Sequence, residues 1–391
     1  MPALAAAAAC LTSCAAPRTP PRTPAAGVAV VIGVALPDRP GMAAIARGAA
    51  LAVETLAADP RAVRQGVRFA VRGAPAGVTS AVALAERLRD DPAVVGIVGD
   101  AESGRTLDAL PVIEDAAGGG RRALVAVTPT ATSPALAGRS AWLFRLSPSD
   151  DAASRSVAAY TLDSLGARRA ALVYRADSYG RDWAAAFVRT FAERGGTVVA
   201  RDPYLAGVTD WLAYARALAL AHPDVVVFPG SADAAAAFLR ALRAAGVRAP
   251  LVGGDAVAPL ADSAEFAGAA YRVHYATTFT AAWAASPGAP ASARQFVARY
   301  QARYGERPGV RAAMGYEAAL LVGHAALAVD LAAPDRRRRI RDQLAALGRA
   351  VPAAAGVVGP VAFDAAHGVA GRGVRVSAVG APDAPGTVAA R

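Results

Sequence analysis

Several residue types are missing or scarce in this chain. It has no lysine and no asparagine among its 391 residues, so all 42 basic residues are arginine. Exclusive use of arginine is typical of codon bias, and we expect no nucleic-acid partner despite the formal charge of +11. Cysteine is limited to Cys10 and Cys14, which excludes disulfides, thiol catalysis and cysteine metal sites from the rest of the chain. No apolar run reaches the roughly 18 residues of a membrane-spanning helix.

Sequence signatures of catalysis are also missing. There is no Gly-x-Ser-x-Gly elbow, no dinucleotide-binding fingerprint and no P-loop. The four histidines are scattered without the spacing of metal ligands: His222, His274, His324 and His367. We therefore expect a protein that is not an enzyme and that uses neither a metal nor a cofactor.

The densest basic cluster is the stretch 335–341, which reads DRRRRIR and begins a predicted helix. Such a cluster either binds phosphate or forms a solvated helix face. No aromatic residue interleaves with the arginines, which favours the solvated face.

The N-terminal segment has the features of an exported lipoprotein. Residues 3–13 are small and apolar, and the tetrapeptide LTSC that ends at Cys14 resembles the lipobox of bacterial lipoproteins. No Lys or Arg precedes the apolar run, which departs from the usual signal peptide. We predict a lipoprotein signal peptide over 1–14, with Cys14 as the lipidated residue and Cys10 unmodified. Residues 15–26 carry four prolines and predict an extended tether, at ~3.1 Å per residue, on an extracytoplasmic protein held at the cell membrane.

Strands and helices alternate along the rest of the chain, and this rhythm occurs twice. Short apolar strands between helices indicate parallel sheets that are covered on both faces. The sequence thus predicts an α/β protein with two doubly wound lobes, followed by a mostly helical last third. The predicted strands are 28–35, 67–71, 94–98, 123–127, 170–174, 197–200, 225–228, 251–252, 361–363 and 374–379. The predicted helices are 42–56, 80–90, 103–117, 152–165, 183–194, 211–221, 232–245, 291–304, 311–331 and 335–347.

Three of the predicted strands end in residues suited to a ligand. Ser103 follows one strand, Thr130 and Thr132 follow the next, and Asp255 follows a strand of the second lobe. Ligands of open α/β sheets bind beyond the carboxyl ends of strands. Taken one at a time, Ser103 could be a plain helix cap, the threonines could bond to their own loop, and Asp255 could be a turn residue. Together, hydroxyls suit a carboxylate and an aspartate suits an ammonium, so we expect an amino-acid-like ligand.

The order and spacing of these motifs resemble those of a known family. The chain is similar to the type I periplasmic binding proteins, in the branch of the leucine/isoleucine/valine receptors of ABC importers. The matching motifs include IGVALP at 32–37, TPTATSP at 128–134, DSYG at 177–180, GGD at 253–255 and YQARYGERP at 300–308.

The resemblance implies a role for each candidate residue. In the family, the counterparts of Ser103, Thr130 and Thr132 hold the α-carboxylate and the α-amino group of the ligand. The counterpart of Tyr179 lies over the ligand from the second lobe, and an acid at the position of Asp255 meets the ammonium. The implied partners are an amino-acid-like small molecule and the permease of an ABC transporter, and we expect a monomer.

The resemblance also implies how the chain divides into lobes. Lobe 1 would comprise 27–146 and 278–359, and lobe 2 would comprise 147–277 and 360–391. Three chain crossings between the lobes would form a three-stranded hinge, near 146–147, 277–278 and 359–360.

The chain departs from the family where the ligand side chain would bind. Gly41 or Met42 stands in the place of one pocket aromatic, and Ser231 or Ala232 in the place of another. An acidic pair is replaced by GAPAG at 73–77. The resemblance therefore assigns no leucine-like specificity. Two alternatives stay open: a ligand-sensing lipoprotein that signals to a membrane partner, and a degenerate receptor that no longer binds a ligand.

Overall fold

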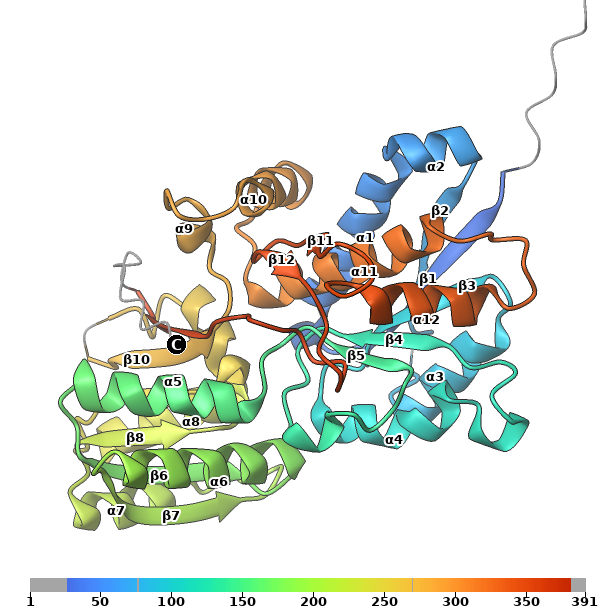
Figure 1. The fold of residues 1–391 in the computed structure, drawn as a ribbon. Coiled ribbons are helices and arrows are strands. Elements are labelled where there is room, and N and C mark those ends of the chain that lie inside the picture. The colour runs from blue at the N-terminus through green and yellow to red at the C-terminus, as the bar shows by residue number, and fades with distance from the viewer. Residues whose placement is uncertain (1–26, 76, 269, 381–391) are drawn as a thin grey trace, which may run out of the picture.

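The computed structural model describes residues 27–75, 77–268 and 270–380. The predicted signal peptide, the tether, Cys10 and Cys14 lie outside the described residues, as do the last eleven residues of the predicted lobe 2. The described chain forms two α/β lobes, each built on its own sheet (Figure 1).

Five parallel strands form the first sheet. They are β1 (Ala29–Ala35), β2 (Arg68–Arg72), β3 (Val94–Gly99), β4 (Val125–Thr128) and β5 (Leu143–Arg145), in the order β2-β1-β3-β4-β5. All six residues of β3 are buried, as expected for a short apolar strand that is covered on both faces.

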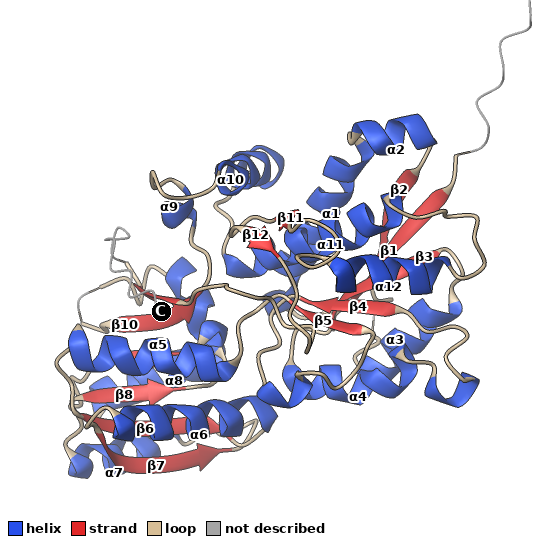
Figure 2. Ribbon diagram, in the orientation of Figure 1, coloured by secondary structure: helices blue, strands red, loops and turns tan. Residues whose placement is uncertain are grey.

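Two layers of helices cover this sheet (Figure 2). One face packs against α1 (Pro40–Ala57), α11 (Val310–Leu327) and α12 (Arg336–Ala346), and the other against α3 (Ala81–Asp90) and α4 (Ser103–Ile113). Two further helices, α2 (Pro60–Gln65) and α10 (Ala291–Tyr304), lie beside α1. The first lobe thus takes three of its helices from the last third of the chain.

The second sheet has six strands in the order β13-β10-β9-β8-β6-β7. The strands are β6 (Arg169–Arg175), β7 (Thr197–Tyr204), β8 (Val225–Phe228), β9 (Leu251–Gly253), β10 (Val273–Thr277) and β13 (Arg375–Ala378), and only the β10–β13 pair is antiparallel. Helices α5 (Asp150–Asp163) and α6 (Ser178–Glu193) cover one face. The other face carries α7 (Trp211–Ala221), α8 (Ala232–Ala244) and the 3-10 helix η3 (Asp255–Asp262).

The remaining elements are short. They are α9 (Ala281–Ala284), β11 (Ala354–Ala355), β12 (Pro360–Val361) and the 3-10 turns at Ala116–Gly118 and Pro134–Leu136. No helix in the described part of the chain has both the length and the apolar character needed to cross a membrane.

The α/β prediction with two doubly wound lobes is confirmed, although some elements differ from those expected. The strands β5 and β10 were not predicted, because LFR and VHYAT are short and carry polar residues among the apolar ones. Helix α6 begins at Ser178, five residues before the predicted start at Trp183, because the Asp177 carboxylate caps it by accepting a hydrogen bond from Gly180 N at 2.8 Å.

The third chain crossing lies later than residues 359–360. Arg145 N donates to His367 O and Val369 N donates to Arg145 O, so this segment still runs beside β5 in the first lobe. The chain reaches the second sheet only at β13. The strand pairing of 367–369 with β5 therefore moves the third crossing to between Val369 and Arg375, while the full lobe limits remain a prediction.

A buried ion pair ties the crossings together. Glu317 on α11 pairs with Arg372 on the third crossing, and their side chains are 1% and 3% exposed. Arg372 also donates to Leu146 O on the first crossing at 3.0 Å, and Arg375 donates to Thr278 O on the second at 2.7 Å. Glu317 in turn accepts from Val357 N at 2.6 Å. The relative position of the lobes thus depends on one small set of charged side chains.

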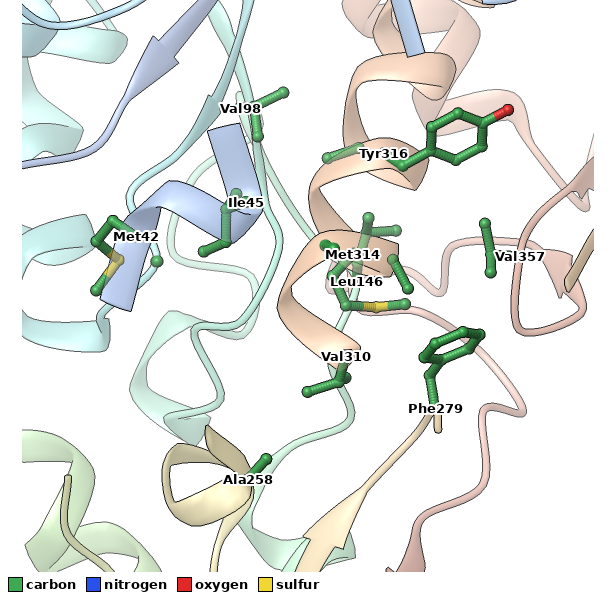
Figure 3. Packing of buried hydrophobic residues seen from close by; sticks show 14 of the residues in the cluster. Met42, Ile45, Val98, Leu146, Ala258, Phe279, Val310, Met314, Tyr316 and Val357 are labelled. Carbon is green, nitrogen blue, oxygen red and sulfur yellow. The ribbon is translucent and has the colours of Figure 1, made fainter. Parts of the chain in front are cut away.

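The packing of α1 against α11 fixes the edge of the first lobe that faces the second. A Cβ at Gly48 would lie 2.1 Å from Ala312 O, and one at Gly315 would lie 2.3 Å from Ile45 O, so only glycine allows this approach. The first turns of the two helices consequently lie side by side, with Met42 and Val310 both buried (Figure 3).

The arginine cluster at 335–341 is only partly the solvated face that was expected, since Arg338 and Arg339 are exposed while others contact the lobe. Arg337 turns inward and donates to the carbonyls of Val94, Arg89 and Asp91 at 2.6–2.9 Å, next to the end of α3. Its neighbours on α12 pair with Asp335. The cluster therefore attaches α12 to the sheet, a structural role that the sequence pattern did not reveal.

We expect the substitution Glu317→Gln to lower the free energy of unfolding by roughly 3–5 kcal/mol, because it leaves the buried Arg372 charge without its partner. The matched control is Glu54→Gln, whose exposed pair with Arg303 spans 3.0 Å and should be worth less than about 1 kcal/mol. Urea unfolding of the two variants measures the difference. Equal losses would show that the pair at the crossings is not a major support of the fold.

Candidate functional site

A small cavity lies where the carboxyl ends of strands from both lobes meet. Its volume is about 70 Å³, and residues of both lobes line it: Met42, Ala101, Glu102, Ser103, Thr130, Arg175, Tyr179, Ser231, Asp255, Ala256, Val310 and Arg311. A second pocket of about 20 Å³ shares Thr130, Asp255 and Val310 with it and adds Thr132. We call the two together the cleft cavity. It brings together all five predicted site residues.

Ser103 is the first residue of α4 and is 3% exposed. The sequence allowed Ser103 to be a plain helix cap, but the capping position belongs to Glu102, and no side chain caps this helix. Ser103 Oγ accepts hydrogen bonds from Thr132 N at 3.3 Å and Ser133 N at 3.2 Å. A hydroxyl has two lone pairs and one proton, so the Ser103 proton remains as a donor toward the cavity.

The two threonines of the β4 loop differ in how their hydroxyls are used. Thr130 Oγ1 donates to Ala101 O at 2.8 Å, which leaves its lone pairs available as acceptors. Thr132 Oγ1 is buried near the Asp150 carboxyl, but it makes no well-formed hydrogen bond among the described residues. A buried hydroxyl without a partner is costly, and a ligand in the cleft cavity would satisfy it.

Tyr179 and Asp255 come from the second lobe. Tyr179 lies in the first turn of α6, and its hydroxyl donates to Asp255 Oδ1 at 3.4 Å. Burial raises the pKa of Tyr179 well above its ordinary value, which keeps the hydroxyl neutral. Desolvation also raises the pKa of Asp255, while the charge of Arg311 and the Tyr179 hydroxyl oppose that rise. Asp255 is partly exposed to the cavity at the end of β9, where a cationic group could reach it.

Asp150, the first residue of α5, is a buried carboxyl close to the cleft cavity that the sequence did not single out, although it ends the motif PSD. It is 1% exposed, and neither carboxylate oxygen makes a hydrogen bond within the described part of the chain. Burial raises its pKa well above the ordinary value, and the charges of Asp255 and Asp182 add to this effect. The nearby Thr132 hydroxyl favours the ionised form but is outweighed.

The lobes also touch directly beside the cleft cavity. Ser133 Oγ, on the β4 loop, donates to the Asp182 carboxylate on α6. Neither residue was predicted to contribute to the site, because each is an ordinary polar residue in the sequence. Only the fold brings the β4 loop and α6 together. This contact shows the lobes approaching each other on the side where Ser103 and Tyr179 lie.

The described residues contain no group of three or more His, Cys, Asp or Glu side chains that could hold a metal ion. The functional groups of the cleft cavity are instead hydroxyls, one aspartate, one glutamate and two arginines. Their chemistry suits reversible binding of a small polar molecule.

The substitution Asp150→Asn should stabilise the ligand-free protein at neutral and higher pH. A carboxyl whose pKa is raised by folding contributes its stability below the unfolded-state pKa, and that contribution is lost as pH rises through the folded-state pKa. The wild-type free energy of unfolding should therefore decrease as the pH rises above the ordinary pKa range of aspartate. The variant should show a smaller decrease. Urea unfolding at several pH values between 4 and 8 measures both.

Asp151→Asn is the matched control, because Asp151 is more than a third exposed and pairs with Arg189 at 2.7 Å. It should show no gain at neutral pH. If Asp150→Asn is no more stable than wild type at any pH, the buried carboxyl has a partner that the structure does not reveal.

Two facing α/β lobes with a polar cavity between their strand ends define the class of two-lobed solute-binding proteins. The comparison with protein families agrees: residues 29–383 match the model of the periplasmic binding protein family. The chain belongs to this family, and the resemblance inferred from its motifs is confirmed.

Comparisons with individual proteins point in the same direction. The chain is 27% identical over 233 residues to an amino acid binding protein of Pseudomonas aeruginosa, a match that covers 58% of this chain and 61% of that relative. It is 28% identical over 179 residues to a Leu/Ile/Val-binding protein of Escherichia coli, covering 46% and 47%. The chain thus matches between about half and two thirds of the length of these curated relatives.

Solved structures share the fold over a longer range. One is the substrate-binding protein of a branched-chain amino acid transporter from Streptococcus pneumoniae, solved in complex with isoleucine. Its TM-score is 0.76 at 24% identity, with 89% of this chain and 95% of that chain covered. At this identity the likeness shows the fold.

Proposed function

We propose that the protein is the extracytoplasmic solute-binding lipoprotein of an ABC importer, and that it binds an amino acid or a similar small molecule in the cleft cavity. The observation that carries the proposal is the state of Ser103. Two backbone amides occupy its lone pairs, so its proton is directed to a ligand acceptor in a cavity that Asp255 lines from the other lobe. The names of the relatives, amino acid binding and Leu/Ile/Val-binding proteins, support the same ligand class.

The two charged groups of an amino acid would meet different parts of the cleft cavity. The carboxylate would accept hydrogen bonds from the hydroxyls of Ser103 and Thr132 and from the free amides in the first turn of α4. The ammonium would donate to the Asp255 carboxylate and to Thr130 Oγ1, which has already given its proton to Ala101 O. Tyr179 would cover the ligand and hold Asp255 in place.

The division of these contacts between the lobes would couple binding to closure. The carboxylate contacts come from lobe 1 and the main ammonium contact comes from lobe 2. A ligand that needs both sets favours the arrangement in which the lobes are close together, by as much as its differential contacts allow. The closed form would then be the one presented to the membrane permease.

Two observations weigh against a degenerate receptor. Thr132, in the cleft cavity, and Asp150, close to it, keep buried polar atoms that make no well-formed hydrogen bond among the described residues, which is costly unless a ligand satisfies them. A sensor lipoprotein would use the same cavity, and the contacts of the ligand would be unchanged. The two roles differ in the membrane partner.

Three substitutions test the contacts with the amino-acid head group. Ser103→Ala and Thr132→Val should weaken carboxylate ligands, and Asp255→Asn should weaken ligands that carry an amine. A hydrogen bond to a charged group contributes about 1.5–3 kcal/mol, so each change should raise Kd by roughly 10- to 150-fold. Calorimetry on an amino acid, its amide and its deaminated analogue separates the two ends of the ligand.

The matched control for these hydroxyl deletions is Ser80→Ala. Ser80 Oγ also accepts a backbone amide at 3.3 Å, but it caps α3 and does not line the cleft cavity. It should cost about 1 kcal/mol of stability and leave Kd unchanged. Affinities of the Ser103→Ala and Asp255→Asn variants that stay within a factor of two of wild type would rule out this binding mode.

The anchor is tested by substituting each N-terminal cysteine in turn. Cys14→Ala should abolish incorporation of a labelled fatty acid and release the protein from the membrane fraction, because only this cysteine ends the lipobox-like tetrapeptide. Cys10→Ala is the control and should label normally. Labelling that persists in Cys14→Ala would contradict the lipid anchor.

A further inference from the structure

The lining of the cleft cavity holds charged groups beyond those that the head group would use. Apart from the hydroxyls, Tyr179 and Asp255, its lining includes Glu102, Arg175, Ser231 and Arg311. The family resemblance implies aromatic side chains around an alkyl group of the ligand in related proteins, and the sequence of this chain lacks them at both expected places. Charged and hydroxyl groups offer little to an alkyl group, because their own desolvation costs free energy.

Most of these charges are already paired within the protein. Glu102 accepts from Arg39 at 2.9 Å, and Arg175 pairs with Asp177. Arg311 differs from both. No carboxylate of the described residues lies within ion-pair distance of it, and its hydrogen bond is to a backbone carbonyl, from Nη1 to Gly41 O at 2.6 Å. Its charge acts on Asp255 from beyond ion-pair distance, and it is the cation of the lining that has no carboxylate of the described residues in direct contact.

The position of Arg311 follows from the packing of the first lobe. It lies in the first turn of α11, which the glycine contacts described above hold against the first turn of α1. A Cβ at Gly41 would lie 2.8 Å from Arg311 Nη1, so the guanidinium occupies the space that a side chain at position 41 would need. Gly41 is one of the two residues, with Met42, that could stand where related proteins have a pocket aromatic. Arg311 therefore takes the place of that aromatic.

We propose that Arg311 binds the far end of the ligand, and that this end carries a carboxylate or, less tightly, an amide oxygen. The proposal rests on the proposed function and specifies the ligand as an acidic amino acid rather than a branched aliphatic one. A guanidinium offers several N–H donors in a plane that matches a carboxylate.

The charges of such a complex would balance. The ligand ammonium meets Asp255, the α-carboxylate meets the hydroxyls of Ser103 and Thr132, and the side-chain carboxylate meets Arg311. Glu102 does not repel this ligand carboxylate strongly, because the ion pair with Arg39 neutralises the charge of Glu102 at the edge of the cavity. Val310, the residue before Arg311, is buried beside Met42 and gives the guanidinium a rigid base (Figure 3).

Three amino acids of similar size test the proposal: L-glutamate, L-glutamine and L-leucine. Calorimetric titration of the full-length chain should give the tightest binding for glutamate, intermediate binding for glutamine and the weakest for leucine. Arg311→Met, which keeps an unbranched side chain and removes the charge, should weaken glutamate by roughly 10- to 150-fold. It should leave leucine unchanged or tighter.

Two further variants separate the possible outcomes. Arg307→Met is the matched control, because Arg307 is exposed and lies outside the cleft cavity, and its affinities should stay within twofold of wild type. Asp255→Asn tests the head-group site in the same titrations. Leucine binding that depends on Asp255 but not on Arg311 would overturn this inference and leave the proposed function standing. Failure of all three amino acids to bind would overturn both.

Discussion

The buried ion pair between Glu317 and Arg372 is the contact on which the arrangement of the two lobes depends. It joins α11 of the first lobe to the third chain crossing, and Arg372 extends the contact to the carbonyl of Leu146 on the first. Each sheet could fold around its own helices, but the cleft cavity exists only where the strand ends of both lobes face each other. An ion pair this well buried is costly to break, so the crossings stay together while the linkers beside them remain free to bend.

The roles of the hydroxyls in the cleft cavity follow from counting their hydrogen bonds. The amides of the β4 loop use the lone pairs of Ser103, and the Ala101 carbonyl uses the proton of Thr130. One hydroxyl is thereby a donor and the other an acceptor before any ligand arrives. Asp255 and Asp150 are carboxyls in a poorly solvated place, where burial raises the pKa of both and disfavours their charged forms. A ligand that brings an ammonium and a carboxylate would interact with these groups and offset the free energy that their burial costs.

Much of the fold was predictable from the sequence, because apolar strands such as 225–228 and helices such as 211–221 coincide with the observed elements. Four of the five predicted site residues were chosen because each follows a strand or opens a helix, and Tyr179 was chosen from the family resemblance; the fold places all five around the cleft cavity. Sequence reasoning missed β5 and β10, because their short sequences carry polar residues among the apolar ones. Hydrogen bonds to the neighbouring strands β4 and β13 hold them in the sheets. It also missed Asp150, Arg311 and the inward turn of Arg337. The burial of Asp150 and the proximity of Arg311 to Gly41 are tertiary facts with no local signal, and the third crossing was misplaced for the same reason.

A crystal structure of the protein with a bound amino acid would test the central claim most directly. The account predicts a closed complex in which the α-carboxylate lies within hydrogen-bond distance of Ser103 Oγ and the ammonium lies within hydrogen-bond distance of the Asp255 carboxylate. A ligand bound outside the cleft cavity, or inside it with the amine directed away from Asp255, would contradict the account.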